Sequence, residues 1–411
     1  MAKVNIKKEQ LDFLNWEFGV FFHFGIRTFY EGHRDWDGLP MPLEGFNPPQ
    51  IDCENWIQTV KEAGAKYAIL VCKHHDGFAN WPTNYTDYSV KNTPWKDGKG
   101  DVVQEFVDAC RKYDIKVGLY YSPAQQGSKD MDGKEYDDYF INQISELLTN
   151  YGKIDYLWFD GCGSEGHNYD TVRIVKEIRK CQPDILIFNM WDPDTRWIGN
   201  EAGIAPVFNK NMLSQLSGFS INKAEGDELE EVRFLPGECD VTIRESNWFY
   251  ADADAHTLKS LDELMALYYT SVGRGANLLL NVAPGRDGRL PENDAKRLLE
   301  LGETIRKTFS EENKISCECT QEDNKLIIDF GGYRKINHIV LSEEISDENE
   351  IESFDIKVRA LPWGEAISTY LGHTVGHKKI CVFPTACARG MEITFDKAKK
   401  VKAEVYYVPA F

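Results

Sequence analysis

Histidines and one carboxylate stand where short apolar runs of the sequence end, and these residue types could do chemistry there. His23 closes one run, His74 and His75 close a second, and Asp160 closes a third, Tyr156-Leu157-Trp158-Phe159. A carboxylate at such a position is costly to bury unless it is paired or used. Three of nine histidines at the ends of two runs favour proton transfer or hydrogen bonding to a polar substrate.

Metal binding is the rival interpretation of these histidines. Adjacent His74 and His75 cannot easily bind one ion from a strand, and the sequence contains no HExxH or HxH pattern beside them. We therefore expect a site without a metal and without a cofactor.

The elements that must position these residues follow an alternating pattern. Strands of four to eight residues that alternate with helices of ten or more predict βα units and a parallel sheet. About seven units fit a (β/α)8-type, TIM-like barrel better than an open sheet, and no GxGxxG follows the first strand. The expected strands are 16–24, 67–74, 116–122, 156–160, 185–190 and 277–282, and the expected helices are 52–64, 101–113, 136–150, 169–181, 258–272 and 292–308.

After this region the pattern changes to short β-rich runs with no helix between them: KLIIDF, INHIVLSEE, FDIKVRA, KKICVFP and AEVYYVP. Runs of this kind, separated by turns, predict an all-β sandwich. The expected domains are therefore a catalytic barrel over residues 1–312 and a C-terminal β-sandwich over residues 313–411.

Side chains alternate along a barrel strand between the interior and the helices, and catalytic groups lie at the carboxyl ends of the strands. In the run 156–160, Leu157 and Phe159 have the parity that faces helices, so Trp158 and Asp160 face inward. The same parity in 118–122 turns Tyr120 inward. Asp160 is thus expected at the mouth of the barrel; a cap for the following loop is the alternative.

The long stretch after the fifth strand, residues 190–201, is rich in aromatic and acidic residues, and a loop of this length on a barrel mouth is usually functional. Glu201 on this loop is a candidate partner for Asp160. Glu238, just before the strand-like CDVTI, is a second candidate. A solvated loop carboxylate is the alternative for Glu201.

The amino-acid composition indicates which classes of molecule the protein can bind. With 66 acidic against 47 basic residues the net charge is −19, which disfavours nucleic acid. Ten Trp and nineteen Tyr suit a flat, partly apolar partner such as a sugar ring. We expect a soluble protein with no membrane span and structural cysteines. The compartment stays open: cytoplasmic, or periplasmic or secreted if a signal peptide has been removed.

At these motifs the chain resembles the retaining α-L-fucosidases of glycoside hydrolase family 29. The matching pieces are FGVFFHFG (18–25), GAKYAILVCKHHDGFANWPT (64–83), GLYYSP (118–123), YLWFDG (156–161) and RGANLLLNVAPGRDG (274–288). RWIGNE (196–201) and PGECDVTIRESNWFY (236–250) resemble the subgroup that prefers α-1,3- and α-1,4-linked fucose.

The resemblance implies a role for each candidate. Asp160 matches the nucleophile and Glu201 the general acid/base. Glu238 is the alternative acid/base, because the wider family has a Trp-Glu pair where this chain reads Gly237-Glu238. The implied substrate-binding residues are His23, Trp36, His74, His75, Tyr120, Trp158, Arg244 and Trp248, of which Arg244 is the loosest match.

The implied activity is the exo-acting, retaining removal of terminal α-L-fucose from an oligosaccharide or glycoconjugate, with two carboxyl groups about 5 Å apart. Two alternatives remain open from the sequence. One is another barrel glycosidase, for example one acting on galactosides, and the other is a non-catalytic carbohydrate-binding barrel. The oligomeric state is not indicated.

Overall fold

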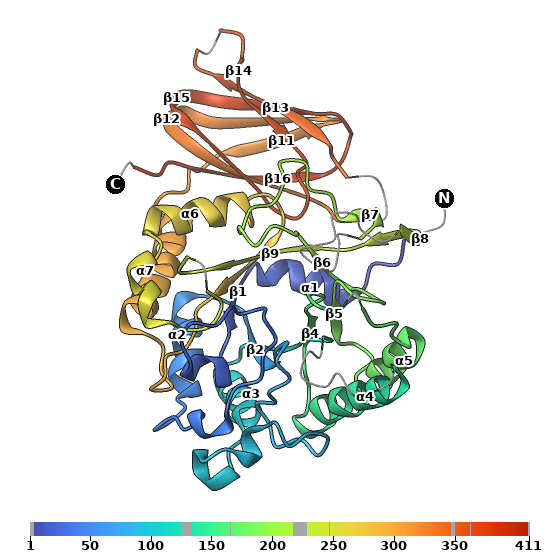
Figure 1. Cartoon of the computed structure of the whole chain (residues 1–411). Coiled ribbons are helices and arrows are strands. Elements are labelled where there is room, and N and C mark those ends of the chain that lie inside the picture. Colours follow the sequence, from blue (N-terminus) through green and yellow to red (C-terminus); the bar gives the residue numbers. More distant parts are fainter. Residues whose placement is uncertain are drawn as a thin grey trace.

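A parallel barrel wrapped by helices and a separate antiparallel β module make up the molecule (Figure 1). The computed structural model describes residues 4–124, 131, 133–164, 166–216, 228–245, 247–346, 350–361 and 363–409. The predicted fold class, a (β/α)8-type barrel followed by an all-β domain, is confirmed.

The barrel is an eight-stranded sheet in the order β5-β4-β3-β2-β1-β10-β9-β6, in which each strand runs parallel to its neighbours. A parallel bridge from Phe188 to Thr195 links the two outermost strands and so nearly closes the barrel. The strands are β1 (Phe18–Phe22), β2 (Tyr67–Lys73), β3 (Lys116–Tyr121), β4 (Tyr156–Phe159), β5 (Leu186–Phe188), β6 (Arg196–Trp197), β9 (Gly237–Thr242) and β10 (Asn277–Asn281).

Helices begin where the sequence supplies a cap. The side chains of Asp52, Asp101 and Asp170 each accept a hydrogen bond from the backbone N–H three residues on, which satisfies a group that the first helical turn leaves unpaired. The helices around the barrel are α2 (Cys53–Ala63), α3 (Val102–Lys112), α4 (Gly133–Asn150), α5 (Thr171–Cys181), α6 (Leu261–Thr270) and α7 (Glu292–Thr308). None of the described helices combines the length and the apolarity that crossing a bilayer requires.

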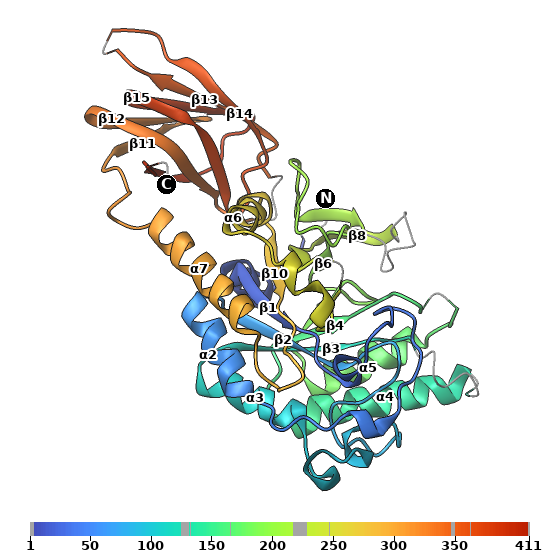
Figure 2. The ribbon, with the colours of Figure 1, turned by 60° about the vertical axis from the view of Figure 1, so that its left-hand side comes forward.

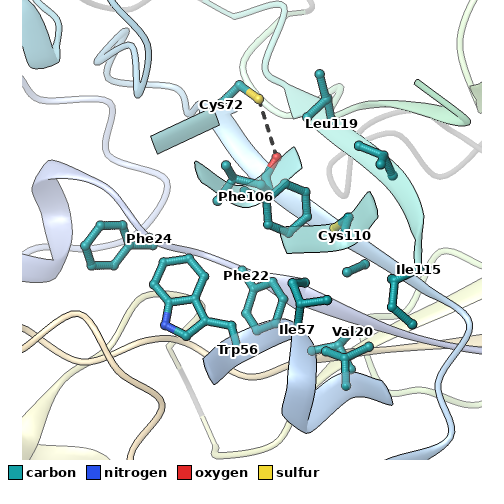
Figure 3. Packing of buried hydrophobic residues seen from close by; sticks show 14 of the residues in the cluster. Val20, Phe22, Phe24, Trp56, Ile57, Cys72, Phe106, Cys110, Ile115 and Leu119 are labelled. Atoms are coloured by element: carbon teal, nitrogen blue, oxygen red, sulfur yellow. Dashed lines mark hydrogen bonds between the residues drawn. The ribbon is translucent and has the colours of Figure 1, made fainter. Parts of the chain in front are cut away.

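The expected alternation of side chains holds along the barrel strands. Leu119 and Tyr121 belong to the outer core between strands and helices, whereas Tyr120 and Trp158 belong to the barrel interior. Figure 3 shows the outer core, where Val20, Phe22 and Phe24 pack against Trp56 and other side chains of α2 and α3. In the same layer the thiols of Cys72 and Cys110 are buried, as expected for structural cysteines.

The amino end of the barrel is filled from below by α1 (Lys8–Trp16). Its Phe13 and Trp16 contact Tyr67 and Tyr156 through ring pairs 5.3–6.4 Å apart. Because this end is packed with aromatic rings, a substrate can enter the barrel from the carboxyl ends of the strands.

The regular alternation of strands and helices ends after β5, in agreement with the long irregular stretch expected there. No helix separates β5 from β6, and the two-residue β6 was not recognised in the sequence. Between β6 and β9 the chain forms β7 (Met212–Gln215) and β8 (Glu228–Phe234), which pair antiparallel outside the barrel. This departure leaves a long loop after β6 at the barrel mouth.

The C-terminal module is an antiparallel sheet in the order β11-β12-β15-β13-β14, with β16 added along β12. Strands β12, β13, β15 and β16 share one apolar core, and Tyr370 of β14 packs against it. The domain boundary near residue 312 stays a prediction. The strands are β11 (Glu318–Glu322), β12 (Lys325–Glu343), β13 (Ser353–Arg359), β14 (Ile367–His373), β15 (Lys379–Phe395) and β16 (Val401–Tyr406).

The module meets the barrel at the amino ends of strands rather than at the mouth. Lys378 forms an ion pair of 2.7 Å with Glu17, which directly precedes β1, and the Ile380 N–H donates to the Gly273 carbonyl just before β10. In both ribbon views α6 lies beneath the module (Figure 1 and Figure 2). The module therefore packs near the amino ends of β1 and β10, and none of its described residues lines the cavity at the opposite end.

Candidate active site

A cavity of about 340 Å³ opens at the carboxyl ends of the barrel strands. It collects most of the residues singled out in the sequence, from strands that lie far apart along the chain. The lining includes His23, Trp36, His74, His75, Tyr120, Trp158, Asp160, Glu201 and Trp248. Two candidates, Glu238 and Arg244, are not part of this lining.

Asp160 follows the last residue of β4 and keeps 26 % of its side chain exposed. One carboxylate oxygen, Oδ2, accepts a hydrogen bond of 2.8 Å from the Tyr120 hydroxyl, and the other, Oδ1, accepts one of 2.9 Å from the Cys162 N–H. The His75 Nε2 lies 3.5 Å from Oδ2. Hydrogen bonds to both oxygens fix the orientation of the carboxylate in the cavity.

The three histidines are neutral groups in this cavity. Burial lowers the pKa of His23 to about 3 and the pKa of His74 well below its ordinary value, and it lowers that of His75 despite the opposing effect of Asp160. From the sequence, the histidines could act either as cations or as neutral hydrogen-bonding groups. Their burial favours neutral hydrogen-bonding groups. Neutral imidazoles can donate or accept hydrogen bonds with sugar hydroxyls.

Neighbours orient two of these rings. The His23 Nδ1 lies 2.8 Å from the Asn281 Oδ1, and the Asn281 amide N–H₂ donates to the Trp248 carbonyl, so the amide oxygen must accept from Nδ1. The Nε2 of His23 is then an acceptor. His75 contacts the Ser122 hydroxyl through Nδ1 at 2.6 Å, which turns its Nε2 toward Asp160.

Aromatic rings form the wall beside Asp160. Tyr120, Trp158 and Phe188 come from three neighbouring strands and stack in series, with ring centroids 5.4 and 4.2 Å apart. Trp248 approaches His23 at 5.0 Å across the cavity. Trp36 stands at the rim of the cavity with 55 % of its surface exposed.

Glu201 lies in the loop that follows β6, and its φ of 49° places it in the left-handed region, which is uncommon for a residue other than glycine. Burial is the main cause that raises its pKa to about 8, and the negative charges of Asp240 and Asp160 follow. A hydrogen bond from the Trp248 side chain opposes the rise. Glu201 therefore keeps a proton near neutral pH, as a general acid must.

Glu238 is completely buried in the barrel interior, below the floor of the cavity. Its carboxylate accepts hydrogen bonds from the Tyr67 hydroxyl (2.6 Å), the Trp158 indole N–H (2.8 Å) and the Tyr156 hydroxyl (3.3 Å). Burial raises its pKa to about 7, and the three hydrogen bonds act in the opposite direction. With these partners, Glu238 holds Trp158 in place from beneath.

Arg244 is engaged elsewhere. Its guanidinium pairs with Asp254 at 3.0 Å and Asp294 at 2.8 Å, and its charged carbon lies 5.2 Å from the centre of the Tyr250 ring. These contacts tie the segment after β9 to α7. Arg244, the loosest match in the sequence, therefore lies outside the lining of the main cavity.

Two cavity carboxylates were missed in the sequence. Asp35 is 3 % exposed and accepts a hydrogen bond from the Trp248 N–H, while its Oδ1 has no hydrogen-bond partner among the described residues. Asp240 is also 3 % exposed and lines the wall. Its position two residues after Glu238 gives both side chains the same parity, a signal that could have identified it.

Within the described part of the chain, one group could hold a metal ion: His74, His75 and Asp160, whose ligand atoms lie within 4.8 Å of one another. The same atoms also suit the hydroxyl groups of a neutral sugar. The expectation of a metal-free site stays a prediction, and chelation tests it.

A barrel whose mouth sets a hydrogen-bonded carboxylate beside a protonated one, among aromatic faces and neutral imidazoles, defines the class of glycoside hydrolases. Comparison with known proteins agrees and gives the family. The family model described as alpha-L-fucosidase matches residues 41–308. The chain belongs to the α-L-fucosidase family, glycoside hydrolase family 29, and is an enzyme of the α-L-fucosidase type.

Relatives and solved structures match along most of their length. Alpha-L-fucosidase 1 of Arabidopsis thaliana is 33 % identical over 433 residues, which cover 94 % of this chain and 84 % of that protein. A glycoside hydrolase 29 family member from a rumen bacterium is 31 % identical, with a TM-score of 0.90 over 100 % of this chain and 78 % of its own. A Ruminococcus gnavus GH29 fucosidase solved in complex with fucose is 26 % identical, with a TM-score of 0.84 over 99 % and 96 %.

Proposed function

We propose that the chain is an exo-acting, retaining α-L-fucosidase that removes terminal α-L-fucose from oligosaccharides or glycoconjugates through a covalent fucosyl–enzyme intermediate. The observation that carries the proposal is the pairing of two unlike carboxyl groups in one cavity. Asp160 is held by two hydrogen-bond donors, and Glu201 is buried enough to keep its proton. Two carboxyl groups in such different environments can act as a nucleophile and as a general acid.

In the first step the Asp160 carboxylate attacks the anomeric carbon of fucose while Glu201 gives its proton to the departing glycosidic oxygen. The bond from the anomeric carbon to that oxygen breaks, and an ester bond to Asp160 forms. Tyr120 and the Cys162 N–H keep the carboxylate oriented for the attack.

In the second step Glu201, now ionised, removes a proton from water, and the resulting nucleophile attacks the same anomeric carbon. The ester bond breaks, fucose leaves with its original anomeric configuration, and both carboxyl groups return to their starting states. Glu238 serves neither step, because three buried donors surround it and it lies outside the cavity.

Fucose recognition follows from the lining. His23, with Nε2 as an acceptor, and His74 line the cavity and can hydrogen-bond to ring hydroxyls. The stacked aromatic wall suits the C6 methyl group and the apolar ring face. The solved R. gnavus relative in complex with fucose supports this choice of sugar. A preference for α-1,3- and α-1,4-linked fucose is part of the proposal, and the resemblance of RWIGNE (196–201) to that subgroup supports it.

The test is turnover of an aryl α-L-fucoside with the product followed by proton NMR before mutarotation. The proposal predicts α-L-fucose as the first product and no comparable turnover of the matching α-galactoside. A first product of inverted configuration would refute retention, and galactoside turnover would favour the other glycosidase. Sugar binding without any turnover would favour a non-catalytic barrel. Trisaccharides with α-1,2-, α-1,3- and α-1,4-linked fucose then test the linkage.

A further inference from the structure

Asp240 is a buried carboxylate in the wall of the cavity. The proposed mechanism, which uses Asp160 and Glu201, gives it no role. It lies on β9, two residues after Glu238. Both side chains therefore point into the barrel, and that of Asp240 lies nearer the mouth. Only 3 % of its surface is exposed, so its position is enforced by packing. A buried carboxylate without a cationic partner costs folding free energy, and such costs concentrate at functional sites.

The contacts of Asp240 link it to the loop that bears Glu201. Its Oδ1 accepts a hydrogen bond of 2.8 Å from the indole N–H of Trp197, the last residue of β6. Trp197 lines the cavity and precedes Glu201 by four residues. Its own backbone N–H donates to the Asn189 side chain at 3.0 Å. Asp240 therefore anchors the strand from which the Glu201 loop departs.

Among the described residues, the charged groups that most affect the pKa values of Glu201 and Asp240 are other carboxyl groups. The charges of Asp240, Asp160 and Asp35, in decreasing order, raise the pKa of Glu201. The charges of Glu238 and Asp160 raise the pKa of Asp240. Hydrogen bonds from Trp248 to Glu201 and from Trp197 to Asp240 are the opposing contacts. Burial and these neighbours raise the pKa of Asp240 to about 7, below the value of about 8 for Glu201.

We infer that Asp240 is a third carboxyl group of the active site, a positioning residue that acts through Glu201 by favouring its protonated form and through Trp197 by fixing the cavity wall. This inference rests on the proposed function. When Asp240 is ionised, its charge disfavours a second charge on Glu201, which lines the same cavity.

The consequence differs between the two steps. Formation of the fucosyl ester removes the charge of Asp160, and that loss alone would weaken Glu201 as a base for the second step. At a pH above about 7, where Asp240 is ionised, its charge persists while the ester forms and is hydrolysed. Glu201 therefore stays basic enough to take the proton from water while the intermediate is hydrolysed.

The experiment compares the pH dependence of kcat/KM for the wild type and for Asp240→Asn with an aryl α-L-fucoside. Asparagine keeps an oxygen acceptor for Trp197 and removes only the charge. We expect the alkaline limb of the profile to move about one pH unit lower, a loss of roughly fivefold at pH 8, with KM nearly unchanged. Asp262→Asn, an exposed residue of α6, is the matched control and should keep the wild-type profile.

An alkaline limb that stays in place in Asp240→Asn, or an equal loss at every pH, overturns the inference. If circular dichroism shows that this variant does not fold, carboxyl-carbon NMR of the wild type decides instead. The Glu201 signal, assigned through Glu201→Gln, should show a second inflection when Asp240 ionises; a single inflection near the ordinary glutamate pKa overturns the inference. Failure of the proposed function is separate, because it shows as wild-type protein without retaining turnover.

Discussion

Replacing Glu201 with glutamine should abolish efficient turnover and at the same time stabilise the folded protein at alkaline pH. The folded protein holds the Glu201 proton with a pKa of about 8, against 4.5 for an ordinary glutamate. Ionisation thus works against folding: the stability that the neutral carboxyl contributes is complete below pH 4.5 and is lost as the pH rises through 8. Glutamine is neutral at every pH and escapes this loss.

The magnitude follows from the shift in pKa. One pKa unit corresponds to about 1.4 kcal/mol, so the full difference sets an upper bound of about 5 kcal/mol. Partial solvent access and coupled titration with Asp240 reduce this value, and we expect a gain of about 1–3 kcal/mol at pH 8.5. For a domain of about 300 residues, that gain raises the melting temperature by about 2–5 °C.

The assay is thermal unfolding of the wild type and Glu201→Gln at pH 4.5 and pH 8.5, followed by circular dichroism. The two proteins should melt together at the lower pH and separate at the higher one. Glu365→Gln, at an exposed position in the β module, is the matched control and should follow the wild type. If the difference in melting temperature between the two proteins were the same at both pH values, the claim that Glu201 is a half-buried carboxyl that keeps its proton would be refuted.

Three further predictions concern the other carboxyl groups and the histidine cluster. Asp160→Asn should lose at least about a thousandfold in kcat yet still bind fucose, measured by calorimetry; near-normal turnover would remove Asp160 as the nucleophile. Glu201→Ala should recover activity with azide, whereas Glu238→Ala should not and should melt earlier, because three buried donors lose their acceptor at about 1–3 kcal/mol each. Prolonged treatment with a chelator should leave kcat/KM unchanged, and recovery of a lost activity by an added divalent ion would establish a metal at His74, His75 and Asp160.

Much of the barrel could be predicted because its strands obey one rule. Apolar residues on alternate positions fixed which way Trp158 and Tyr120 point, and both do face the interior. β6 escaped prediction because two residues have no periodicity; parallel pairing with β9 defines it. Its position depends on contacts distant in sequence, and these set where the Glu201 loop begins.

The places of Glu238 and Asp240 in the barrel could not be predicted from the sequence for a related reason. Glu238 and Asp240 share one face of β9, and only the register decides their height in the barrel. Glu238 is level with Asn277 at the start of β10, whereas Asp240 is level with Leu279, two residues nearer the mouth. That offset places one carboxyl below the floor and the other in the cavity wall.

The claim on which the mechanism depends is that Asp160 forms a covalent bond to fucose. A 2-deoxy-2-fluoro-α-L-fucosyl derivative with a good leaving group should accumulate the ester, and mass spectrometry of the digested protein should place the added sugar on the peptide containing Asp160. The label found on Glu201, Glu238 or Asp240 instead, or no label under conditions in which the parent fucoside is hydrolysed, would contradict the account.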